Sequence, residues 1–158
     1  MSSLLYVIDP PDPNGVANSL PFFVIVPTQS SLPPRVLIVM PDQWPRALLR
    51  AALREQGYDA VGTRNLDSAL RVLPDEPERG PVRLIIVDQP ALAGAADQLK
   101  QLLERHRAPS TLLLARNTQT SPKGEWAKIL RRPLSIADAV TASEALIPLS
   151  PEDRHPID

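Results

Sequence analysis

The chain of 158 residues contains no cysteine, and its two histidines, His106 and His155, lie far apart. The missing thiols exclude disulfides, cysteine–zinc centres and thiol catalysis, and with so few imidazoles we expect no metal site. The 17 basic and 18 acidic residues nearly cancel, so we expect neither nucleic acid nor an acidic membrane as a partner. No apolar run reaches the ~18 residues that a membrane span needs.

Glycine is also scarce, and this bears on cofactors and catalysis. The six glycines are too scattered for a phosphate-binding loop of the G-x-G-x-x-G or Walker type. No serine–histidine–aspartate or cysteine–histidine arrangement is evident either. We therefore expect a protein that is not an enzyme and that carries no cofactor.

Proline, in contrast, is abundant and unevenly placed. Of the 19 prolines, 7 lie in residues 1–34 and 3 in residues 148–158. Proline removes a backbone donor and fixes φ, so these ends should resist regular structure. We predict an N-terminal extension (1–34), a folded domain (35–147) and a C-terminal tail (148–158). Residues 1–34 lack the lysines and arginines of a signal peptide, so the expected location is cytoplasmic.

The N-terminal extension is nevertheless rich in apolar residues. Two strand-like runs, 4–8 and 22–26, flank a turn-rich segment, and the second run begins with Phe22 and Phe23. Disordered tails are normally poor in such residues. Three interpretations remain open: a strand or clamp packed on its own domain, an anchor offered to a partner, and a frayed tail or misassigned start.

The middle of the chain alternates between short apolar runs and helical periodicity. The strands are predicted at 35–40, 58–63, 83–88, 111–115 and 128–131, and the helices at 43–56, 66–73, 95–107 and 136–146. Residues 75–81 are predicted to form a loop. This alternation favours a doubly wound, flavodoxin-like α/β fold with a five-stranded parallel sheet of order 2-1-3-4-5. Ligand chemistry in such sheets lies beyond the carboxyl ends of the strands.

Helix boundaries follow from capping residues. Asp42, Asn65 and Ser135 are placed as N-caps, and Gly57 as the residue that ends the first helix. In that first helix Trp44, Leu48, Ala51 and Ala52 recur at helical spacing, which favours a helix. Asp42 has a competing interpretation as a metal ligand, and Trp44 can either cover the end of the sheet or contact a partner.

Three segments together resemble the receiver domain of bacterial response regulators over roughly residues 35–147. RVLIV…ALLRAALREQGYDAV is similar to the first strand, first helix and second strand of that family. LIIVD is similar to the third strand, which ends in the phosphoacceptor aspartate, here Asp88. RRPLS is similar to the Lys-Pro segment after the fifth strand, and it places Arg132 before the family's cis-proline, here Pro133.

The chain departs from that family at the positions that carry its chemistry. The resemblance implies two acidic Mg²⁺ ligands after the first strand, but Met40 and Pro41 stand there. The family's Ser or Thr after the fourth strand is Ala115, and its Lys is Arg132. Only the 12 residues Arg116–Ala127 separate the last two strands, which leaves little room for the usual fourth helix.

These departures predict a degenerate site. Phosphoryl transfer to a carboxylate needs a cation to offset the charge, and Asp88 alone would bind Mg²⁺ weakly. Arg132 is instead expected to pair with Asp88 or to be solvated, although it can also hold an anion. The clusters Arg105-His106-Arg107 and Arg131-Arg132 are interpreted as charged element ends rather than a nucleic-acid surface. His106 is expected in the core or in solvent.

The leading function is a pseudo-receiver that acts as a protein–protein interaction or adaptor module in bacterial signalling or in a larger assembly. Its partner, or a second copy of the chain, is expected to bind at Phe22, Phe23, Trp44, Ile136 and Val140. The apolar positions of the last helix predict an interface, although a helix packed on two elements has the same pattern. Two alternatives stay open: a single-domain response regulator phosphorylated at Asp88, and a small nucleotide- or flavin-binding protein.

Overall fold

The structure is a computed structural model that describes residues 2–7, 22–27, 32–116 and 124–150. The chain divides into two units, Met1–Ser31 and Leu32–Asp158. This division falls close to the predicted end of the extension at residue 34. The two units are therefore described one at a time.

The N-terminal unit contains one antiparallel pair of strands. β1 (Ser2–Val7) pairs with β2 (Phe22–Pro27), with Leu4 opposite Ile25 and Tyr6 opposite Phe23. Both predicted strands of the extension are therefore present, within a residue or two of their expected bounds. The turn-rich segment predicted between them lies outside the described residues. Whether this unit is a clamp or an anchor stays a prediction.

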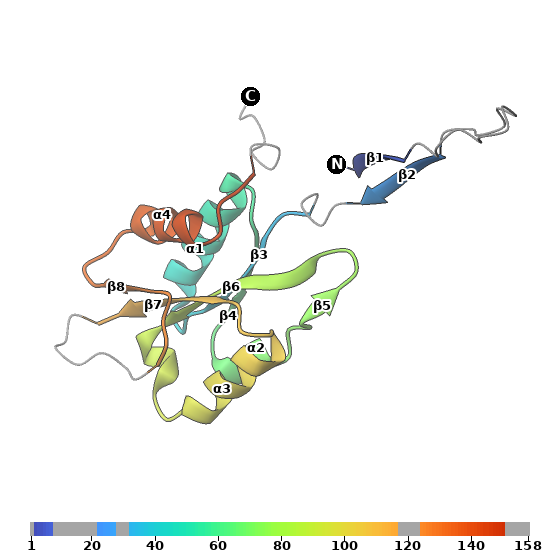
Figure 1. The fold of residues 1–158 in the computed structure, drawn as a ribbon. Helices are drawn as coiled ribbons and strands as arrows, with labels where there is room; N and C mark the ends of the chain where they lie inside the picture. Colours follow the sequence, from blue (N-terminus) through green and yellow to red (C-terminus); the bar gives the residue numbers. More distant parts are fainter. Residues whose placement is uncertain (1, 8–21, 28–31, 117–123, 151–158) are drawn as a thin grey trace, which may run out of the picture. The chain divides into compact units, whose positions relative to one another are not determined.

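The second unit is built on the predicted parallel sheet (Figure 1). Its five parallel strands are β3 (Arg35–Val39), β4 (Asp59–Thr63), β6 (Gly80–Asp88), β7 (Ser110–Ala115) and β8 (Lys128–Arg131). They lie in the order β4-β3-β6-β7-β8, which is the second, first, third, fourth and fifth strand along the chain. The predicted order 2-1-3-4-5 is confirmed.

The segment predicted as the loop 75–81 is more regular than expected. β5 (Asp75–Glu76) pairs antiparallel with the start of β6, which begins at Gly80 and not at residue 83. The turn is closed by the Arg79 N–H, which donates to the Glu76 carbonyl at 3.0 Å, and Gly80 takes a φ of +75°. Such a short hairpin leaves too few alternating residues to be recognised from the sequence.

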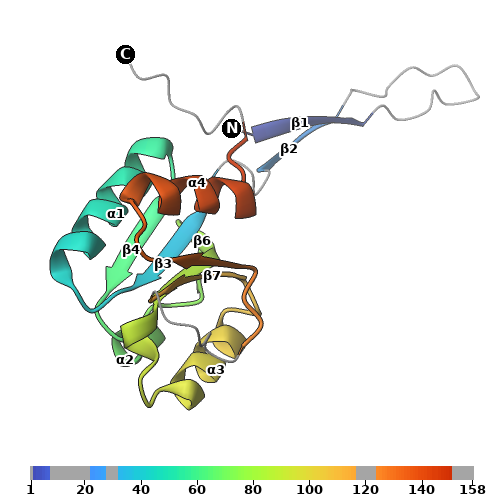
Figure 2. The same cartoon turned by 90° about the vertical axis from the view of Figure 1, so that its left-hand side faces the viewer.

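Two pairs of helices cover the two faces of the sheet (Figures 1 and 2). α1 (Gln43–Gln56) and α4 (Ile136–Leu146) lie on one face, and α2 (Leu66–Leu70) and α3 (Ala96–Arg105) on the other. All five residues of β3 are buried, and its four apolar side chains, which follow Arg35, alternate between two apolar clusters. Strands covered on both faces explain the continuous apolar runs of the sequence.

Three of the four predicted capping positions are confirmed in full. The Asn65 side chain accepts from the Ser68 N–H at 2.8 Å, and Gly57 ends α1 with a φ of +113°. Ser135 and Asp138 form a reciprocal capping box, with distances of 3.1 and 2.8 Å. Asp42 occupies the N-cap position of α1, but its side chain makes no capping hydrogen bond, so that part of the prediction is wrong.

The apolar residues that indicated α1 in the sequence are not the ones at the centre of its buried face. Leu49 and Leu53 are fully buried, whereas Trp44 is 79% exposed and Leu48 54% exposed. The helix carries two apolar stripes, and the sheet covers the one that contains Leu49 and Leu53, which lie 140–180° around the helix from Trp44 at about 100° per residue. Trp44 therefore does not cover the end of the sheet.

The last helix packs on its own domain. Val140 is 9% exposed within the cluster beneath α1 and α4, and Ile136 packs partly against the same cluster. The second interpretation of its broad apolar face therefore describes Val140, which is not accessible to a partner. Leu149, predicted to lie in the C-terminal tail, is also buried there; residues 151–158 lie outside the described residues. Among the described helices none is long and apolar enough to cross a membrane.

Candidate functional site at the carboxyl ends of the strands

The carboxyl ends of the parallel strands bring the predicted site residues together. Asp88 is the last residue of β6, and Ala115 is the last of β7. Met40 follows β3 directly, and Arg132 follows β8 directly. Parallel pairing places all four strand ends at one edge of the sheet. Along the chain these residues lie up to 92 positions apart, from Met40 to Arg132.

The centre of the site is an ion pair between Asp88 and Arg132. The Arg132 Nη2 donates to the Asp88 Oδ1 at 2.8 Å. The Asp88 side chain is 1% exposed and the Arg132 side chain 42% exposed, so a buried carboxylate is matched by a cation that water still reaches. Because β7 lies between β6 and β8, the Arg132 side chain crosses the end of β7 to reach Asp88. The predicted pairing is confirmed in this structure.

The backbone holds Arg132 in place for this contact. The Arg132 N–H donates to the Ala115 carbonyl at 3.0 Å, which continues the pairing of β8 with β7 by one residue. The Arg132–Pro133 peptide bond is cis, as the resemblance implies. Ala115 is fully buried, and its methyl group offers no hydrogen bond to an anion.

The segment after β3 begins with a buried apolar side chain. Met40 is 2% exposed and belongs, with Val36 and Ile38, to the cluster beneath α1 and α4. Pro41 and Asp42 are exposed. The Arg46 Nη1 donates to the Met40 carbonyl at 2.8 Å and to the Pro41 carbonyl at 3.2 Å. The backbone oxygens at this corner are therefore occupied by α1.

These residues do not fit the magnesium ion that the fold family implies. Mg²⁺ prefers several oxygen ligands in octahedral geometry. Met40 supplies a thioether inside the core, Pro41 supplies no side-chain oxygen, and the Asp88 carboxylate is already paired. Within the described part of the chain, no three acidic or histidine side chains gather as a metal site. We therefore derive no chemical step through a metal.

One polar contact at this edge was not predicted from the sequence. The Gln89 Oε1 accepts from the Arg116 N–H at 2.6 Å and so ties the residue after β6 to the residue after β7. One indication of this contact was present in the sequence, namely that Gln89 directly follows Asp88 at the end of a predicted strand. Arg46 was missed for a similar reason: its target is backbone carbonyl oxygen, which leaves no mark in the sequence.

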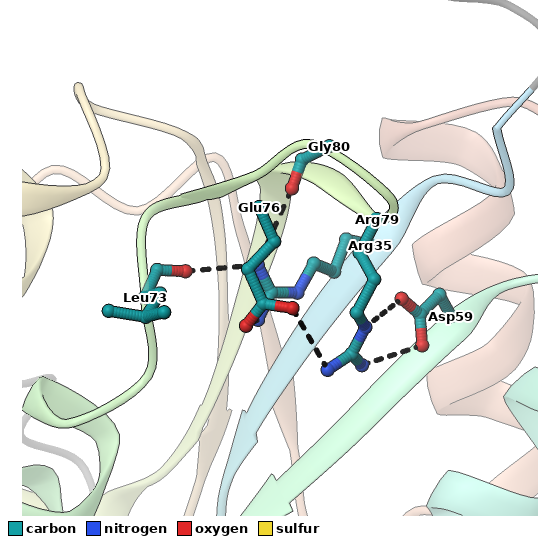
Figure 3. Close-up of polar contacts among 6 residues, drawn as sticks. All are labelled: Arg35, Asp59, Leu73, Glu76, Arg79 and Gly80. Carbon is teal, nitrogen blue, oxygen red and sulfur yellow. Dashed lines mark hydrogen bonds and ion pairs between the residues drawn. The ribbon is translucent and has the colours of Figure 1, made fainter.

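The opposite, amino-terminal edge of the sheet carries a second polar cluster (Figure 3). Arg35 begins β3 and is 1% exposed. Its Nη1 donates to the carbonyls of Leu73 at 2.9 Å and Gly80 at 3.4 Å, and its Nη2 donates to the Glu76 Oε1 at 3.4 Å. A buried guanidinium is thus held mainly by backbone oxygen and by one carboxylate that is 30% exposed.

Arg79 completes this cluster with two parallel hydrogen bonds. Its Nε and Nη2 donate to the two carboxylate oxygens of Asp59, both at 2.9 Å, and its Nη1 lies 3.9 Å from the Glu76 Oε2. The hydrogen bonds from Arg79 lower the pKa of Asp59, and burial opposes them. Burial lowers the pKa of Arg35, and the charge of Arg79 adds to that effect. The two arginines and two carboxylates balance in charge.

The comparisons with known proteins agree with this architecture. No family model matches the chain, and no curated protein sequence matches it. An adenylate cyclase structure from Rhodopirellula baltica is similar over 73% of this chain and 88% of its own, with a TM-score of 0.59 and 20% identity. A response regulator receiver protein from Burkholderia phymatum is similar over 74% and 97%, with a TM-score of 0.58 and 19% identity.

A third structure is similar to about the same extent. It is the receiver domain of a sensor histidine kinase from Pseudomonas aeruginosa, with a magnesium ion coordinated in its active-site cleft. It covers 72% of this chain and 97% of its own, with a TM-score of 0.57 and 15% identity. Such identities show a shared fold and no more. The domain that begins at Leu32 therefore has the fold of response-regulator receiver domains.

Proposed function

We propose that the chain is a non-catalytic receiver-like module that binds another protein, as an adaptor in bacterial signalling or in a larger assembly, without magnesium-dependent phosphotransfer. One observation carries this proposal: the buried Asp88 carboxylate is paired with Arg132 at 2.8 Å. The guanidinium occupies the carboxylate that a phosphoryl donor and a metal ion would need.

Charge supports this function over phosphotransfer. A phosphoryl donor and a carboxylate are both anionic, so their reaction needs a cation to offset the developing charge. Arg132 offsets the charge of Asp88, but a guanidinium group only donates hydrogen bonds and cannot bind a metal ion. The Pseudomonas aeruginosa receiver domain holds magnesium in its cleft; in this chain the buried Met40 and the exposed Pro41 follow the first strand of the sheet.

Intact mass after incubation with acetyl phosphate and Mg²⁺ tests the proposal. The wild-type chain is expected to keep its unmodified mass while a reactive receiver domain in the same buffer gains a phosphate. An adduct on the wild type that is absent from the Asp88→Asn variant would overturn the proposal. Retention of a nucleotide or flavin after purification would instead favour the binding protein considered from the sequence.

A specific observation also favours a second candidate, a response regulator phosphorylated at Asp88. Asp88 ends the third parallel strand, where the resemblance places the phosphoacceptor. The Arg132 side chain is 42% exposed, so it can be displaced without unfolding the sheet. The Arg132→Gln variant separates the two functions, because freeing Asp88 should permit modification only if the rest of the site can support it.

An adaptor needs an accessible surface, and α1 offers one. Trp44 and Leu48 are 79% and 54% exposed and lie one turn apart on the same side of the helix. Large exposed apolar side chains at neighbouring positions are typical of binding surfaces. Trp44→Ala should weaken partner binding or self-association. Arg50→Gln, at an exposed position about 120° around the helix from Trp44, is the control and should leave binding unchanged.

The N-terminal extension is the other proposed contact, through Phe22 and Phe23 in β2. Deleting residues 1–34 should leave the receiver-like domain folded and abolish binding if the extension is an anchor. Circular dichroism and analytical ultracentrifugation measure the two outcomes. Global unfolding of the truncated chain would show instead that the extension belongs to the core.

A further inference from the structure

The face of the domain that α1 and α4 cover carries two large exposed apolar side chains. Trp44 and Leu48 are 79% and 54% exposed, and both lie on α1. α4 lies beside α1 on the same face of the sheet (Figures 1 and 2). Three of its exposed positions hold small side chains, at Ala137, Thr141 and Ala145. One helix of this face therefore presents large apolar groups to solvent, and the other presents small ones.

The small residues form one stripe along α4. Ala137, Thr141 and Ala145 follow one another at intervals of four residues, which places them on one side of the helix. Small side chains let a neighbouring helix approach closely, so this α4 stripe has room for the ring of a tryptophan that packs against it. Val140 lies on the buried side of the same helix, so the stripe, and not Val140, is what another molecule can contact.

Opposite charges accompany the two helices. Arg54 is exposed in the last turn of α1, and Glu144 lies in the last turn of α4. Among the described residues neither side chain forms an ion pair within the chain. Glu144 lines a hollow of about 260 Å³ together with Gln56, Pro148 and Leu149. This volume far exceeds the ~10–15 Å³ that one water requires, so a side chain can enter, and the carboxylate favours a cation there.

These features match one another across a two-fold axis. In a two-fold dimer both partners use the same surface, so its own features have to be complementary. α1 and α4 each follow the end of a parallel strand, so both run from the carboxyl edge of the sheet toward the amino edge. A two-fold axis along the helices therefore sets α1 of one copy on α4 of the other, in the same direction. An axis across the helices would set α4 on α4, which contains Asp138 and Glu144 but no basic residue.

We propose that two copies of this chain associate face to face through α1 and α4, with Trp44 and Leu48 of each copy packed on the α4 stripe of the other. Arg54 and Glu144 both lie in the last turn of their helices, so the parallel arrangement brings Arg54 of each copy to the hollow beside Glu144 of the other. The inference rests on the proposed function, because it names a second copy as the partner for the α1 surface.

Analytical ultracentrifugation of the full chain tests this proposal. Sedimentation equilibrium over a range of concentrations should show a reversible equilibrium between monomer and dimer. Trp44→Ala should raise the dissociation constant at least about tenfold, because a tryptophan is a typical hot spot and a two-fold dimer loses it twice. Leu73→Ala is the matched control, since Leu73 is 53% exposed but lies outside α1 and α4, and it should leave the dissociation constant unchanged.

Exchanging the two charges tests the arrangement of the helices. Arg54→Glu and Glu144→Arg should each raise the dissociation constant about fivefold, because each sets like charges together at both symmetric contacts. The chain with both changes should return to within about twofold of the wild type, since the opposite charges then meet again. Lys100→Glu, at an exposed position of α3, is the control for the change of net charge. Urea midpoints show whether each variant is folded.

Three results would overturn the proposal. They are a chain that stays monomeric up to about 1 mM, a dimer that Trp44→Ala leaves intact, and a doubly exchanged chain that associates no better than the single variants. Failure here is distinct from failure of the proposed function. A monomer that gains no phosphate from acetyl phosphate would remain a non-catalytic module, whereas a dimer that is phosphorylated at Asp88 would keep this contact and lose that function.

Discussion

The two edges of the sheet bury charges of opposite sign. At the carboxyl edge the buried partner is an acid, Asp88, and its cation, Arg132, is 42% exposed. At the amino edge the buried partner is a base, Arg35, and its acid, Glu76, is 30% exposed. Arg35 also donates to two backbone carbonyls, whereas the Asp88 carboxylate has one side-chain partner among the described residues, Arg132.

This difference indicates which interactions stabilise each edge. A buried charge that loses its only partner is left uncompensated, which is costly. A buried charge with several acceptors loses little when one of them is removed. The carboxyl edge should therefore depend on a single side chain, Arg132, and the amino edge on the whole cluster.

The largest effect is expected from Arg132→Met. This change leaves the carboxylate of Asp88 buried without a cation, so the free energy of unfolding should fall by about 2–4 kcal/mol at pH 7, the range for a broken buried pair discounted for the exposure of Arg132. Urea unfolding followed by circular dichroism measures it. Arg50→Met, at an exposed position of α1, is the matched control. A loss no larger than in that control would contradict the comparison.

A smaller loss, about 1–3 kcal/mol, is expected from Arg35→Met. Here the cost comes from the carbonyls of Leu73 and Gly80, which lose their donor, rather than from a stranded charge. Glu76→Gln should cost less than about 1 kcal/mol, because an amide still accepts a hydrogen bond and the site is part-exposed. If Glu76→Gln proved the more damaging of the two, the ion pair and not the backbone would dominate this edge.

The Asp59–Arg79 pair should be visible in the pH dependence of stability. The folded pKa of Asp59 lies below its ordinary 3.8, first because of the hydrogen bonds from Arg79. The pair therefore contributes its full stabilisation above about pH 4 and loses it as the pH falls through the lower folded pKa. Asp59→Asn should cost about 1 kcal/mol at pH 7.

The Asp59→Asn variant also tests the predicted pH dependence. Comparing urea midpoints of the wild type and Asp59→Asn from pH 7 down to pH 2.5 should give two curves that are parallel above about pH 4 and that converge below it. Curves that stay parallel down to pH 2.5 would show that Asp59 does not gain stability from Arg79.

The smallest effect is expected from Asp88→Asn. Arg132 keeps 42% of its side-chain surface in water, so it is solvated when the carboxylate is lost. The free energy of unfolding should change by less than about 1 kcal/mol. The contrast with Arg132→Met is the sharpest test of the comparison, because the two variants remove opposite ends of one contact. Equal losses of stability in both variants would contradict the comparison, because leaving the buried carboxylate unpaired would then cost no more than leaving the exposed guanidinium unpaired.

The fold was predictable in outline from local pattern. Apolar runs such as 35–40 and 83–88 are typical of strands covered on both faces, and their alternation with helices favours a parallel sheet. Asn65, Gly57 and Ser135 marked helix ends correctly, because capping depends on a few neighbouring residues. The β5 hairpin was missed, since two paired residues leave no periodic signal.

The carboxyl edge was more predictable than the amino edge. The pairing of Asp88 with Arg132 followed from the rule that parallel strands end together and from two segments that resemble one family. Nothing comparable indicated the cluster of Arg35, Asp59, Glu76 and Arg79, whose members come from β3, β4, β5 and the turn between β5 and β6. Arg35 is the first residue of the apolar strand β3, and this position is a local hint that its side chain is buried.

The sequence by itself determined the strand order, most helix ends and the chemistry present at the strand ends, because these depend on residue type and spacing along the chain. Tertiary structure alone decided which stripe of α1 is buried, that Val140 is inaccessible, and that His106 is buried. Each of these depends on which surface a neighbouring element covers, and several faces of similar apolarity compete for that cover until the whole domain has packed.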